Sequence, residues 1–413
     1  RDRSPSRGLG DVYKRQALFF AACAASAQES VVKEAKSAKA NPEEAAKIIE
    51  PALADPTTAN DPETWKLAGD FQKAIYDDEN MKLYLPGGKA DTARLYNSLA
   101  KMFEYYMKCD EVEQAKVKSG ELKKPKLRKK LAKELATVRP QLTNAGIEAF
   151  NSNNYPNALK YFGLFVDAPA SPVFEDNAEI KNDTLTPLFA NYAALAANFV
   201  KDNAAIIKYA TIGKEHKEEG YRSLMCLAEV YGKGETPDSA QWLATIKEGV
   251  EKFPAQEYFI GNLMDFYIQK GKVDEGLTQI DAVLAKNPSP YFMYVKGVLQ
   301  YEKKDYDAAI ATFNEIIAKN AEFVAEAYSK IGDCYFFQGQ SIEEETSKIS
   351  MDDPKYAEGE AKVKDFYSKA QPFYEKAKEL APDNKQLWGQ FLLRIYWKLN
   401  KAEYDALEKE LGY

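Results

Sequence analysis

Apolar side chains recur at spacings of three and four along the chain, from Val31 to the C-terminus. This spacing matches the 3.6 residues per turn of an α-helix, where such positions share one buried face. Alternating runs of Val, Ile and Thr, which would indicate strands, are few. The pattern therefore predicts an all-α fold.

Two segments repeat one pattern of small, polar and aromatic residues at identical spacing. In each, a glycine is followed twelve positions later by Ala and sixteen positions later by Phe. One copy consists of Gly297, Tyr301, Asp305, Tyr306, Ala309 and Phe313, and the other of Gly146, Phe150, Asn154, Tyr155, Ala158 and Phe162. Self-similarity of this kind indicates a repeat architecture.

Weaker copies of the pattern occupy much of the remaining chain. Gly332 lies 35 residues after Gly297 and starts the next copy. Others run through Leu227, Ala228, Tyr231 and Pro254, through Leu263, Tyr267, Gly271, Gly276, Ile280 and Pro288, and through Phe189, Tyr192, Ala193, Ala205 and Tyr209. Trp65, Ala68 and Gly69 give a similar start near the N-terminus.

The pattern has a physical basis in the packing of a helix pair. A Gly or Ala lets two antiparallel helices approach closely, aromatic side chains fill the space beside that contact, and a Pro ends the second helix. Each pair leaves one apolar face that only the next pair can cover. On these residues the chain resembles the tetratricopeptide repeat family. The resemblance implies a right-handed α-solenoid of stacked antiparallel helix pairs.

The resemblance also divides the chain into segments. Residues 139–383 are expected to form about six repeats, the last with Gly332, Tyr335 and Gly339 in its first helix and Ala370, Tyr374, Ala377 and Pro382 in its second. Residues 28–138 are expected to form divergent helices of the same kind. Residues 384–413, which include Trp388, are expected to cap the array.

Three stretches depart from the repeat. From Gly332 to Ala370 is 38 residues where the good copies have 12, which predicts an insert at 340–365 between two helices of one unit. Residues 77–91 form a second insertion. Residues 116–133 are rich in lysine and have no register with the repeat.

The first 27 residues do not follow the helical pattern. Residues 1–16 resemble translated adaptor DNA and are set aside as non-native. Residues 17–27 are apolar, end in Ala25-Ser26-Ala27 and are predicted to be a truncated signal peptide cut after Ala27. Two alternatives remain: the start of a buried helix, or a lipoprotein signal in which Phe20-Ala21-Ala22-Cys23 directs lipidation of Cys23.

Composition narrows the class of protein. A mean hydropathy of −0.51 with 29% charged residues excludes a multi-span membrane protein. The formal net charge is −7, and it becomes −10 without residues 1–27, so nucleic acid is not expected as a partner. Cys109, Cys226 and Cys334 lie far apart and are predicted to be small buried hydrophobes.

Residues suited to catalysis or metal binding are scarce. The one histidine, His216, lies in a charged segment and is predicted to be solvated. Without a second histidine, no zinc site or Ser-His-Asp triad is expected, and no Gly-rich phosphate loop is found. The sequence therefore predicts no enzyme, no cofactor and no metal. The remaining alternative is an enzyme whose catalytic centre lies within the inserts.

Two clusters of charge are interpreted as solvated surface. Glu343 to Glu345 and Asp352-Asp353 lack the spacing of calcium ligands. The basic run from Lys123 to Lys130 is interpreted as a solvated helix face, with an anionic lipid surface or nucleic acid as the alternative.

The resemblance places the first helix of each pair along a concave groove. On that face we expect a partner-binding set of aromatic and acidic side chains, which suit an extended peptide or a helix. The set consists of Tyr291, Tyr294, Tyr301, Phe336, Phe337, Asp265 and Asp333. The alternative is that these aromatic residues only pack between repeats.

One subclass of ligand is disfavoured. The Lys and Asn residues that hold a terminal carboxylate in chaperone-binding members of the family are replaced here by Thr143 and Ile147, Tyr294 and Val298, and Ser329 and Asp333. The expected function is a non-enzymatic scaffold that binds a protein or peptide in the periplasm of a Gram-negative bacterium. The alternative is an outer-membrane assembly factor anchored by a lipid on Cys23.

Overall fold

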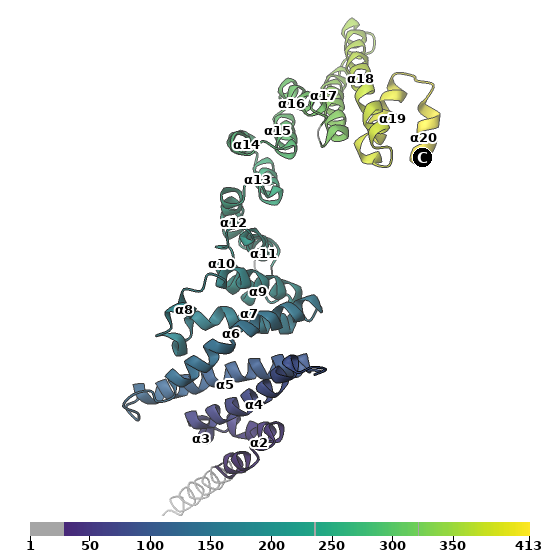
Figure 1. Cartoon of the computed structure of the whole chain (residues 1–413). Helices are drawn as coiled ribbons and strands as arrows, with labels where there is room; N and C mark the ends of the chain where they lie inside the picture. Colours follow the sequence, from purple (N-terminus) through teal and green to yellow (C-terminus); the bar gives the residue numbers. More distant parts are fainter. Residues whose placement is uncertain (1–28, 235–236, 321) are drawn as a thin grey trace, which may run out of the picture. The chain divides into compact units, whose positions relative to one another are not determined.

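The computed structural model describes residues 29–234, 237–320 and 322–413. Every regular element in these residues is a helix, so the all-α prediction is confirmed (Figure 1). The chain divides into two compact units, residues 1–238 and residues 239–413. The predicted adaptor-like run, the predicted signal peptide and Cys23 lie outside the described residues.

In unit 1, helices that follow one another in the chain pack together as antiparallel neighbours. Helix α4 contacts α5, α6 contacts α7, and α9 contacts both α7 and α10. The elements are α2 (Pro42–Ala54), α3 (Pro56–Ala59), α4 (Pro62–Tyr84), α5 (Thr92–Lys118), α6 (Arg128–Asn151), α7 (Tyr155–Asp167), η1 (Ala168–Ala170), η2 (Pro172–Phe174), α8 (Ala178–Lys181), α9 (Thr186–Val200), α10 (Asn203–Gly213) and α11 (Gly220–Lys233).

Unit 2 follows the same scheme, with α17 and α18 forming its most extensive helix pair. Its elements are α12 (Ser239–Lys252), α13 (Glu257–Gln269), α14 (Val273–Lys286), α15 (Pro290–Glu302), α16 (Tyr306–Ala318), α17 (Val324–Thr346), α18 (Pro354–Leu380), η3 (Lys385–Leu387), α19 (Gly389–Lys398) and α20 (Tyr404–Leu411). Helices α19 and α20 contact each other, and α19 packs on α18.

A recurring turn joins the two helices of a pair. One residue with positive φ is followed by an Asp or Asn whose side chain accepts a hydrogen bond from a backbone N–H of the next helix. Asn153, Lys201 and Lys304 hold the positive φ, at 58°, 59° and 64°. Asn154, Asp202 and Asp305 are the caps that follow them. In these three pairs the second helix therefore begins directly after its capping residue.

The glycines of the repeat lie against the aromatic residues that follow them by sixteen positions. A Cβ atom built at Gly297 would lie 2.5 Å from the Phe313 ring, and one at Gly146 would overlap the Phe162 ring. The predicted packing of small residues against aromatic rings is therefore confirmed in the two best copies.

The insert predicted at 340–365 takes a different form from the one expected. These residues continue α17 and α18 as two long antiparallel helices, and only residues 347–353 connect them. Gly332 still meets an aromatic ring, that of Tyr374, at 2.9 Å from a built Cβ, and Gly339 meets Tyr367 at 2.8 Å. Close contact thus continues two turns beyond the repeat, so the extra residues lengthen the pair instead of interrupting it.

The stretch predicted at 77–91 likewise ends α4 and leads into α5. Glu79 is buried there and accepts hydrogen bonds from Lys82, from the backbone N–H of Asp91 and from Arg94, at 2.7 to 2.8 Å. One carboxylate therefore joins the end of α4 to the start of α5.

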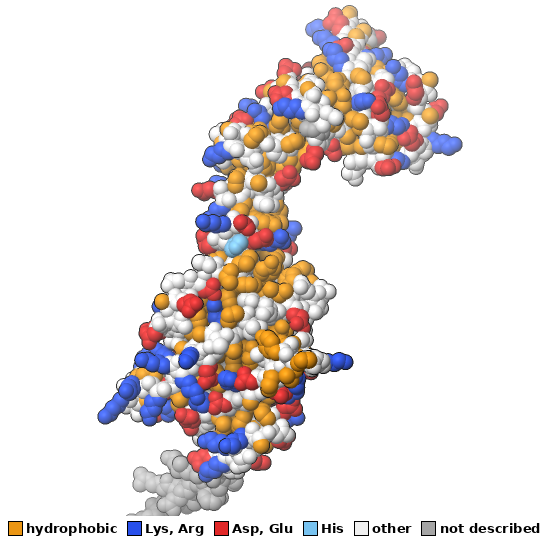
Figure 2. Space-filling model, in the orientation of Figure 1, with side chains coloured by type: hydrophobic (Ala, Val, Ile, Leu, Met, Phe, Trp, Pro, Cys, Tyr) orange, Lys and Arg blue, Asp and Glu red, His pale blue; other side chains and the backbone are white. Residues whose placement is uncertain are grey.

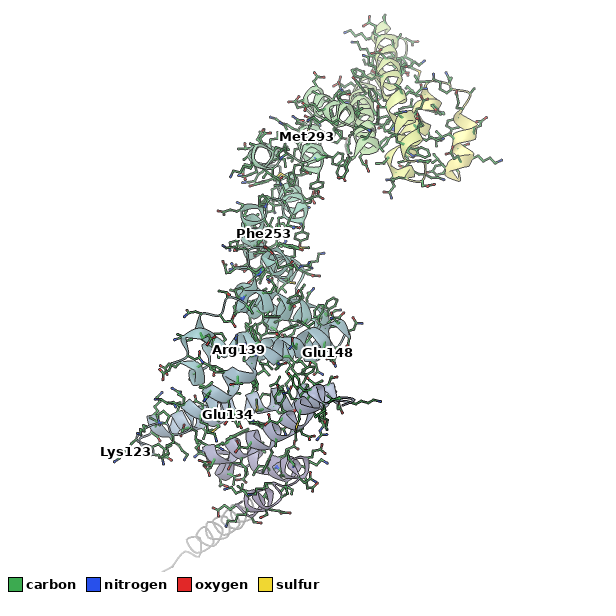
Figure 3. The ribbon with its side chains drawn as sticks, in the orientation of Figure 1. Lys123, Glu134, Arg139, Glu148, Phe253 and Met293 are labelled. Atoms are coloured by element: carbon green, nitrogen blue, oxygen red, sulfur yellow. The ribbon has the colours of Figure 1, made fainter. Side chains whose placement is uncertain are left out.

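The lysine-rich stretch is partly a loop, which corrects the predicted helix face. Residues 119–127 connect α5 to α6, and Lys123 lies at the outer end of this connection (Figure 3). The buried carboxylate of Glu113 accepts hydrogen bonds from the backbone N–H groups of Lys126 (2.7 Å) and Leu127 (3.0 and 3.1 Å). A carboxylate that satisfies loop N–H groups replaces the hydrogen bonds a helix would have supplied.

The three cysteines Cys109, Cys226 and Cys334 are buried and free, as predicted. Burial raises the pKa of Cys109 and of Cys334 to about 12 and that of Cys226 to about 11. Among the residues that the structure describes, no helix combines the length and the apolar character needed to cross a bilayer.

Candidate partner-binding site

The main candidate site is a hollow beside the long α17–α18 pair. In the register that places Gly297 opposite Gly332, α15 ends level with Phe337, whereas α17 continues to Thr346. Nine further residues correspond to about 13 Å of helix. The projecting part of α17 and α18 therefore forms a wall beyond the end of α15, and we call the space beside it the notch.

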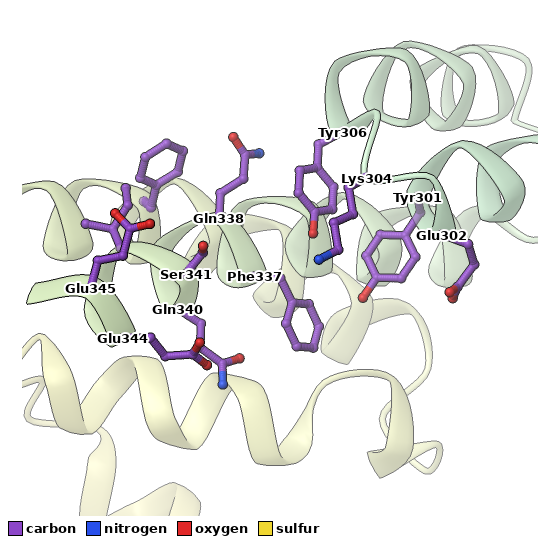
Figure 4. A pocket seen from close by; sticks show the side chains of 12 residues that line it. Tyr301, Glu302, Lys304, Tyr306, Phe337, Gln338, Gln340, Ser341, Glu344 and Glu345 are labelled. Atoms are coloured by element: carbon purple, nitrogen blue, oxygen red, sulfur yellow. The ribbon is translucent and has the colours of Figure 1, made fainter. Parts of the chain in front are cut away.

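The notch has a volume of about 740 Å³ and is open to solvent (Figure 4). One side is formed by the end of α15, the turn and the start of α16, and the other by α17 with one residue of α18. Its lining residues are Tyr301, Glu302, Lys304, Tyr306, Phe337, Gln338, Gln340, Ser341, Ile342, Glu344, Glu345 and Phe366.

Four half-buried aromatic rings give the notch its apolar surface: Tyr301, Tyr306, Phe337 and Phe366. The Tyr301 ring lies 5.8 Å from Tyr306 and 6.1 Å from Phe337, centroid to centroid. Burial, and then the charge of Asp333, raises the pKa of Tyr301. This residue therefore presents a neutral hydroxyl and a ring at neutral pH.

The charges at the notch are mostly acidic. Glu302, Glu344 and Glu345 are exposed, and none of them forms an ion pair with the described part of the chain. Lys304 is the basic residue of the lining. It occupies the positive-φ position of the turn, and Figure 4 shows its side chain between those of Tyr301 and Tyr306.

The wall of the notch is braced from behind by Glu343. Its carboxylate accepts hydrogen bonds from Tyr367 (2.9 Å), Arg394 (2.8 Å) and Lys398 (2.7 Å). These residues belong to α18 and α19, so one side chain of α17 joins three helices. The hydrogen bonds from Lys398, Tyr367 and Arg394 together lower the pKa of Glu343 against the opposing effect of burial.

Of the seven residues predicted from the sequence, the structure brings Tyr301 and Phe337 together in the notch. Tyr294 lies elsewhere on α15 and stacks on Phe323 at 5.4 Å, and Tyr291 lies 5.9 Å from the same ring. Asp265 is exposed on α13 and does not line the notch.

Phe336 and Asp333 are buried, which corrects their prediction as groove residues. Phe336 is 2% exposed and stacks on Tyr367 at 4.9 Å. Asp333 accepts a hydrogen bond from the Tyr374 hydroxyl at 2.6 Å and pairs with Lys330 at 2.8 Å. Both follow Gly332 on the α17 face that packs on α18, so the helical period turns them inward while Phe337 points into the notch.

Sequence reasoning missed Tyr306, Lys304 and Phe366 as members of the site. Phe366 lies just past the predicted insert, and nothing in the repeat pattern places it near residue 301. The signal that was present is the acidic run Glu343 to Glu345, whose last two members line the notch.

A second, smaller hollow of about 370 Å³ lies in unit 1 and was not predicted. It is lined by Phe150, Leu188, Asn191, Tyr192, Leu195, Phe199, Glu219 and Arg222. Phe199 is 57% exposed and stacks on Tyr155 at 4.0 Å. Hydrophobic side chains also gather on the visible face of unit 1 (Figure 2).

His216 has a structural partner in the turn before α11. Its Nδ1 atom accepts a hydrogen bond from the backbone N–H of Glu219 at 3.0 Å. The sequence predicts a solvated histidine, and the side chain is half-buried. Within residues 29–234, 237–320 and 322–413, no three His, Cys, Asp or Glu side chains converge as a metal site requires.

Comparison with known proteins matches one part of the chain to a family. Residues 267–325, from α13 to the start of α17, match the sequence profile of a tetratricopeptide repeat family. No curated protein matches the sequence.

Solved structures with related helix arrangements share little sequence with this chain. One is a TPR repeats protein from Bacteroides fragilis, with 15% identity, coverage of 63% of this chain and 98% of that chain, and a TM-score of 0.31. Another is the C-terminal part of a TPR repeat-containing protein from Cytophaga hutchinsonii, with 15% identity, coverage of 64% and 92%, and a TM-score of 0.40. A third is the human IFIT1 dimer with PPP-AAAA, with 16% identity, coverage of 84% and 73%, and a TM-score of 0.36.

Proposed function

Because this chain carries tetratricopeptide repeats, matched over residues 267–325, we propose that it is a non-enzymatic scaffold that binds a protein or peptide partner. The observation that carries the proposal is the notch. Half-buried aromatic rings beside open solvent are typical anchor points of protein interfaces. The acidic net charge favours a protein partner over nucleic acid.

The proposed place of action is the periplasm of a Gram-negative bacterium. Support for export comes from the sequence of residues 17–27, with its small residues at Ala25 and Ala27. A second candidate is an assembly factor held at the outer membrane, supported by the lipoprotein-like sequence that ends at Cys23.

Blocking the notch tests the scaffold proposal. Ser341 is exposed on α17 and lines the notch, so Ser341→Arg places a long side chain in the hollow without disturbing buried groups. The matched control is Ser368→Arg, at an exposed position of α18 that does not line the notch. Each tagged protein is incubated with an envelope extract of the host, and bound proteins are quantified by mass spectrometry.

The wild type and Ser368→Arg should recover the same partners, and Ser341→Arg should lose them. Equal recovery by all three proteins would show that the notch does not bind these partners. Failure of the wild type to retain any protein above a tag-only control would contradict the scaffold itself.

The mature N-terminus distinguishes the two locations. Intact mass and N-terminal sequencing of protein made in a Gram-negative host should give a chain that begins at Gln28 and is processed in the presence of globomycin. A lipid-modified N-terminal Cys23, with globomycin-sensitive processing, would support the anchored candidate instead.

A further inference from the structure

We propose that the notch binds an extended basic segment of the partner, with a lysine or arginine side chain held between the aromatic rings and the carboxylates. This inference rests on the proposed scaffold function and names the chemistry of its ligand. Four observations support it: unpaired acids, rings that already accept ammonium groups, the length of the wall, and the position of Lys304.

The carboxylates of the notch have no ion-pair partner among the described residues. Two other acids of the same region are neutralised by the chain itself: Asp274 pairs with Lys303 at 2.7 Å and Asp365 pairs with Lys369 at 2.7 Å. Glu302, Glu344 and Glu345 have no such partner in the described residues. With Lys304 as the basic residue of the lining, the notch keeps an acidic balance that a cationic side chain would complement.

Two of the four aromatic rings of the notch already have a lysine ammonium group near them. The Lys330 ammonium lies 4.9 Å from the Tyr301 ring centroid, and that of Lys369 lies 5.1 Å from the Phe366 centroid. Cation–π attraction of this kind is stronger where water is partly excluded. A side chain that combines a positive charge with an aliphatic stem satisfies both the rings and the acids.

The dimensions fit an extended segment. The projecting wall is about 13 Å long, which corresponds to about four residues of extended chain. The volume of about 740 Å³ exceeds that of one side chain, so there is room for flanking residues as well.

Lys304 brings a positive charge into the lining that would hold the basic ligand. The positive-φ turn holds its backbone, at φ 64°, and its exposed side chain lines the notch together with Tyr301 and Tyr306 (Figure 4). It therefore opposes a basic ligand by like charge. Removing this charge should strengthen binding, whereas a purely structural role would predict no gain.

The test is fluorescence anisotropy of the full chain with a labelled, capped eight-residue peptide of alternating lysine and alanine, at low salt. Glu344→Gln/Glu345→Gln should weaken binding by about fivefold, from two exposed charge pairs. Lys304→Asn should tighten it by about twofold, from one repulsion removed. Asparagine suits the turn because Asn153 holds the equivalent position in α6–α7.

The matched control is Glu358→Gln/Glu379→Gln, which makes the same change in net charge at exposed positions of α18 outside the notch. It should bind like the wild type, and circular dichroism should show all variants equally folded. A glutamate–alanine peptide should bind far more weakly than the basic one.

Equal weakening by the control pair would show that net charge alone attracts the peptide and would overturn the proposal. If Lys304→Asn does not bind the basic peptide more tightly than the wild type does, the proposal is overturned as well. If these tests fail while Ser341→Arg still loses partners from the extract, the scaffold function stands and only the basic ligand is wrong. If Ser341→Arg recovers partners normally, the assignment of the notch as the partner-binding site is wrong.

Discussion

Gly297 lies so close to Phe313 that an added methyl group would come 2.5 Å from the aromatic ring. Gly297→Ala should therefore destabilise unit 2 by about 1–3 kcal/mol, the usual cost of overpacking. Phe313→Leu alone removes ring volume and should also destabilise. The double variant should cost less than the two single costs added together, because the smaller side chain makes room for the methyl group. Urea unfolding followed by circular dichroism measures all three, and strict additivity would argue against the contact.

The Tyr374 hydroxyl is one of two strong partners of a buried carboxylate. Tyr374→Phe leaves Asp333, whose side chain is 7% exposed, with Lys330 alone, and should cost about 1–3 kcal/mol. The matched control is Tyr106→Phe, which removes a similar 2.8 Å hydrogen bond to Asp70. The Asp70 side chain is 39% exposed, so water can replace the lost hydrogen bond. Tyr106→Phe should therefore reduce the free energy of unfolding by less than Tyr374→Phe does. Urea unfolding of the two variants compares them, and equal costs would show that burial of the acid does not matter.

Glu113 holds the loop between α5 and α6 by accepting backbone hydrogen bonds from Lys126 and Leu127. Glu113→Ala leaves these N–H groups without their acceptor, at a local cost of about 1–3 kcal/mol. Trypsin should then cut after Lys123 or Lys126 roughly tenfold faster. Glu121→Ala, which removes an exposed ion pair with Lys116 and a hydrogen bond from the Ser119 hydroxyl, serves as control. Similar cleavage of all three proteins would show that Glu113 does not restrain the loop.

Glu79 should make the stability of unit 1 depend on pH. The hydrogen bond from Lys82, helped by the Asp91 N–H and the charge of Arg94, lowers the pKa of Glu79 below its ordinary 4.5 despite burial. A folded pKa below the unfolded one means that the unfolded chain binds the proton more readily. The stabilisation is then complete above pH 4.5 and is lost as the pH falls through the lowered value.

Melting curves of the wild type and Glu79→Gln between pH 3 and pH 8 check this. The variant should melt lower at neutral pH, and the gap should narrow as the pH falls below 4.5. A gap that stays constant over the whole range would mean that the charge of Glu79 contributes nothing.

The sequence predicts the packing of the helix pairs well because that packing depends on local spacing. Gly146 and Phe162, like Gly297 and Phe313, meet where a sixteen-residue separation brings them together across a turn. The same contact between Gly69 and Tyr106 was not foreseen. Its separation of 37 residues hides it from a search at fixed spacing.

The candidate site was harder to predict because it depends on where helices end. The extra residues of 340–365 break the repeat spacing and suggest a separate insertion. Two glycines seven residues apart on α17, Gly332 and Gly339, nevertheless let the helix pair continue. The wall, and with it the notch, follows from that continuation. Phe336 is buried in the core, whereas Phe337 lies at the surface. Two adjacent aromatic residues do not show which of them faces the core, because that depends on the rotation of the helix about its axis.

The bracing of α17 by Glu343 links the notch to the C-terminal helices mechanically. Because the same carboxylate binds Tyr367, Arg394 and Lys398, a ligand that displaced the notch wall would also displace the residues of α19 that are bonded to it. Trp397 lies on α19 beside Lys398 and is 62% exposed, so its indole is sensitive to the local solvent. The fluorescence of Trp397 should therefore change when a ligand binds in the notch, although Trp397 does not line the notch.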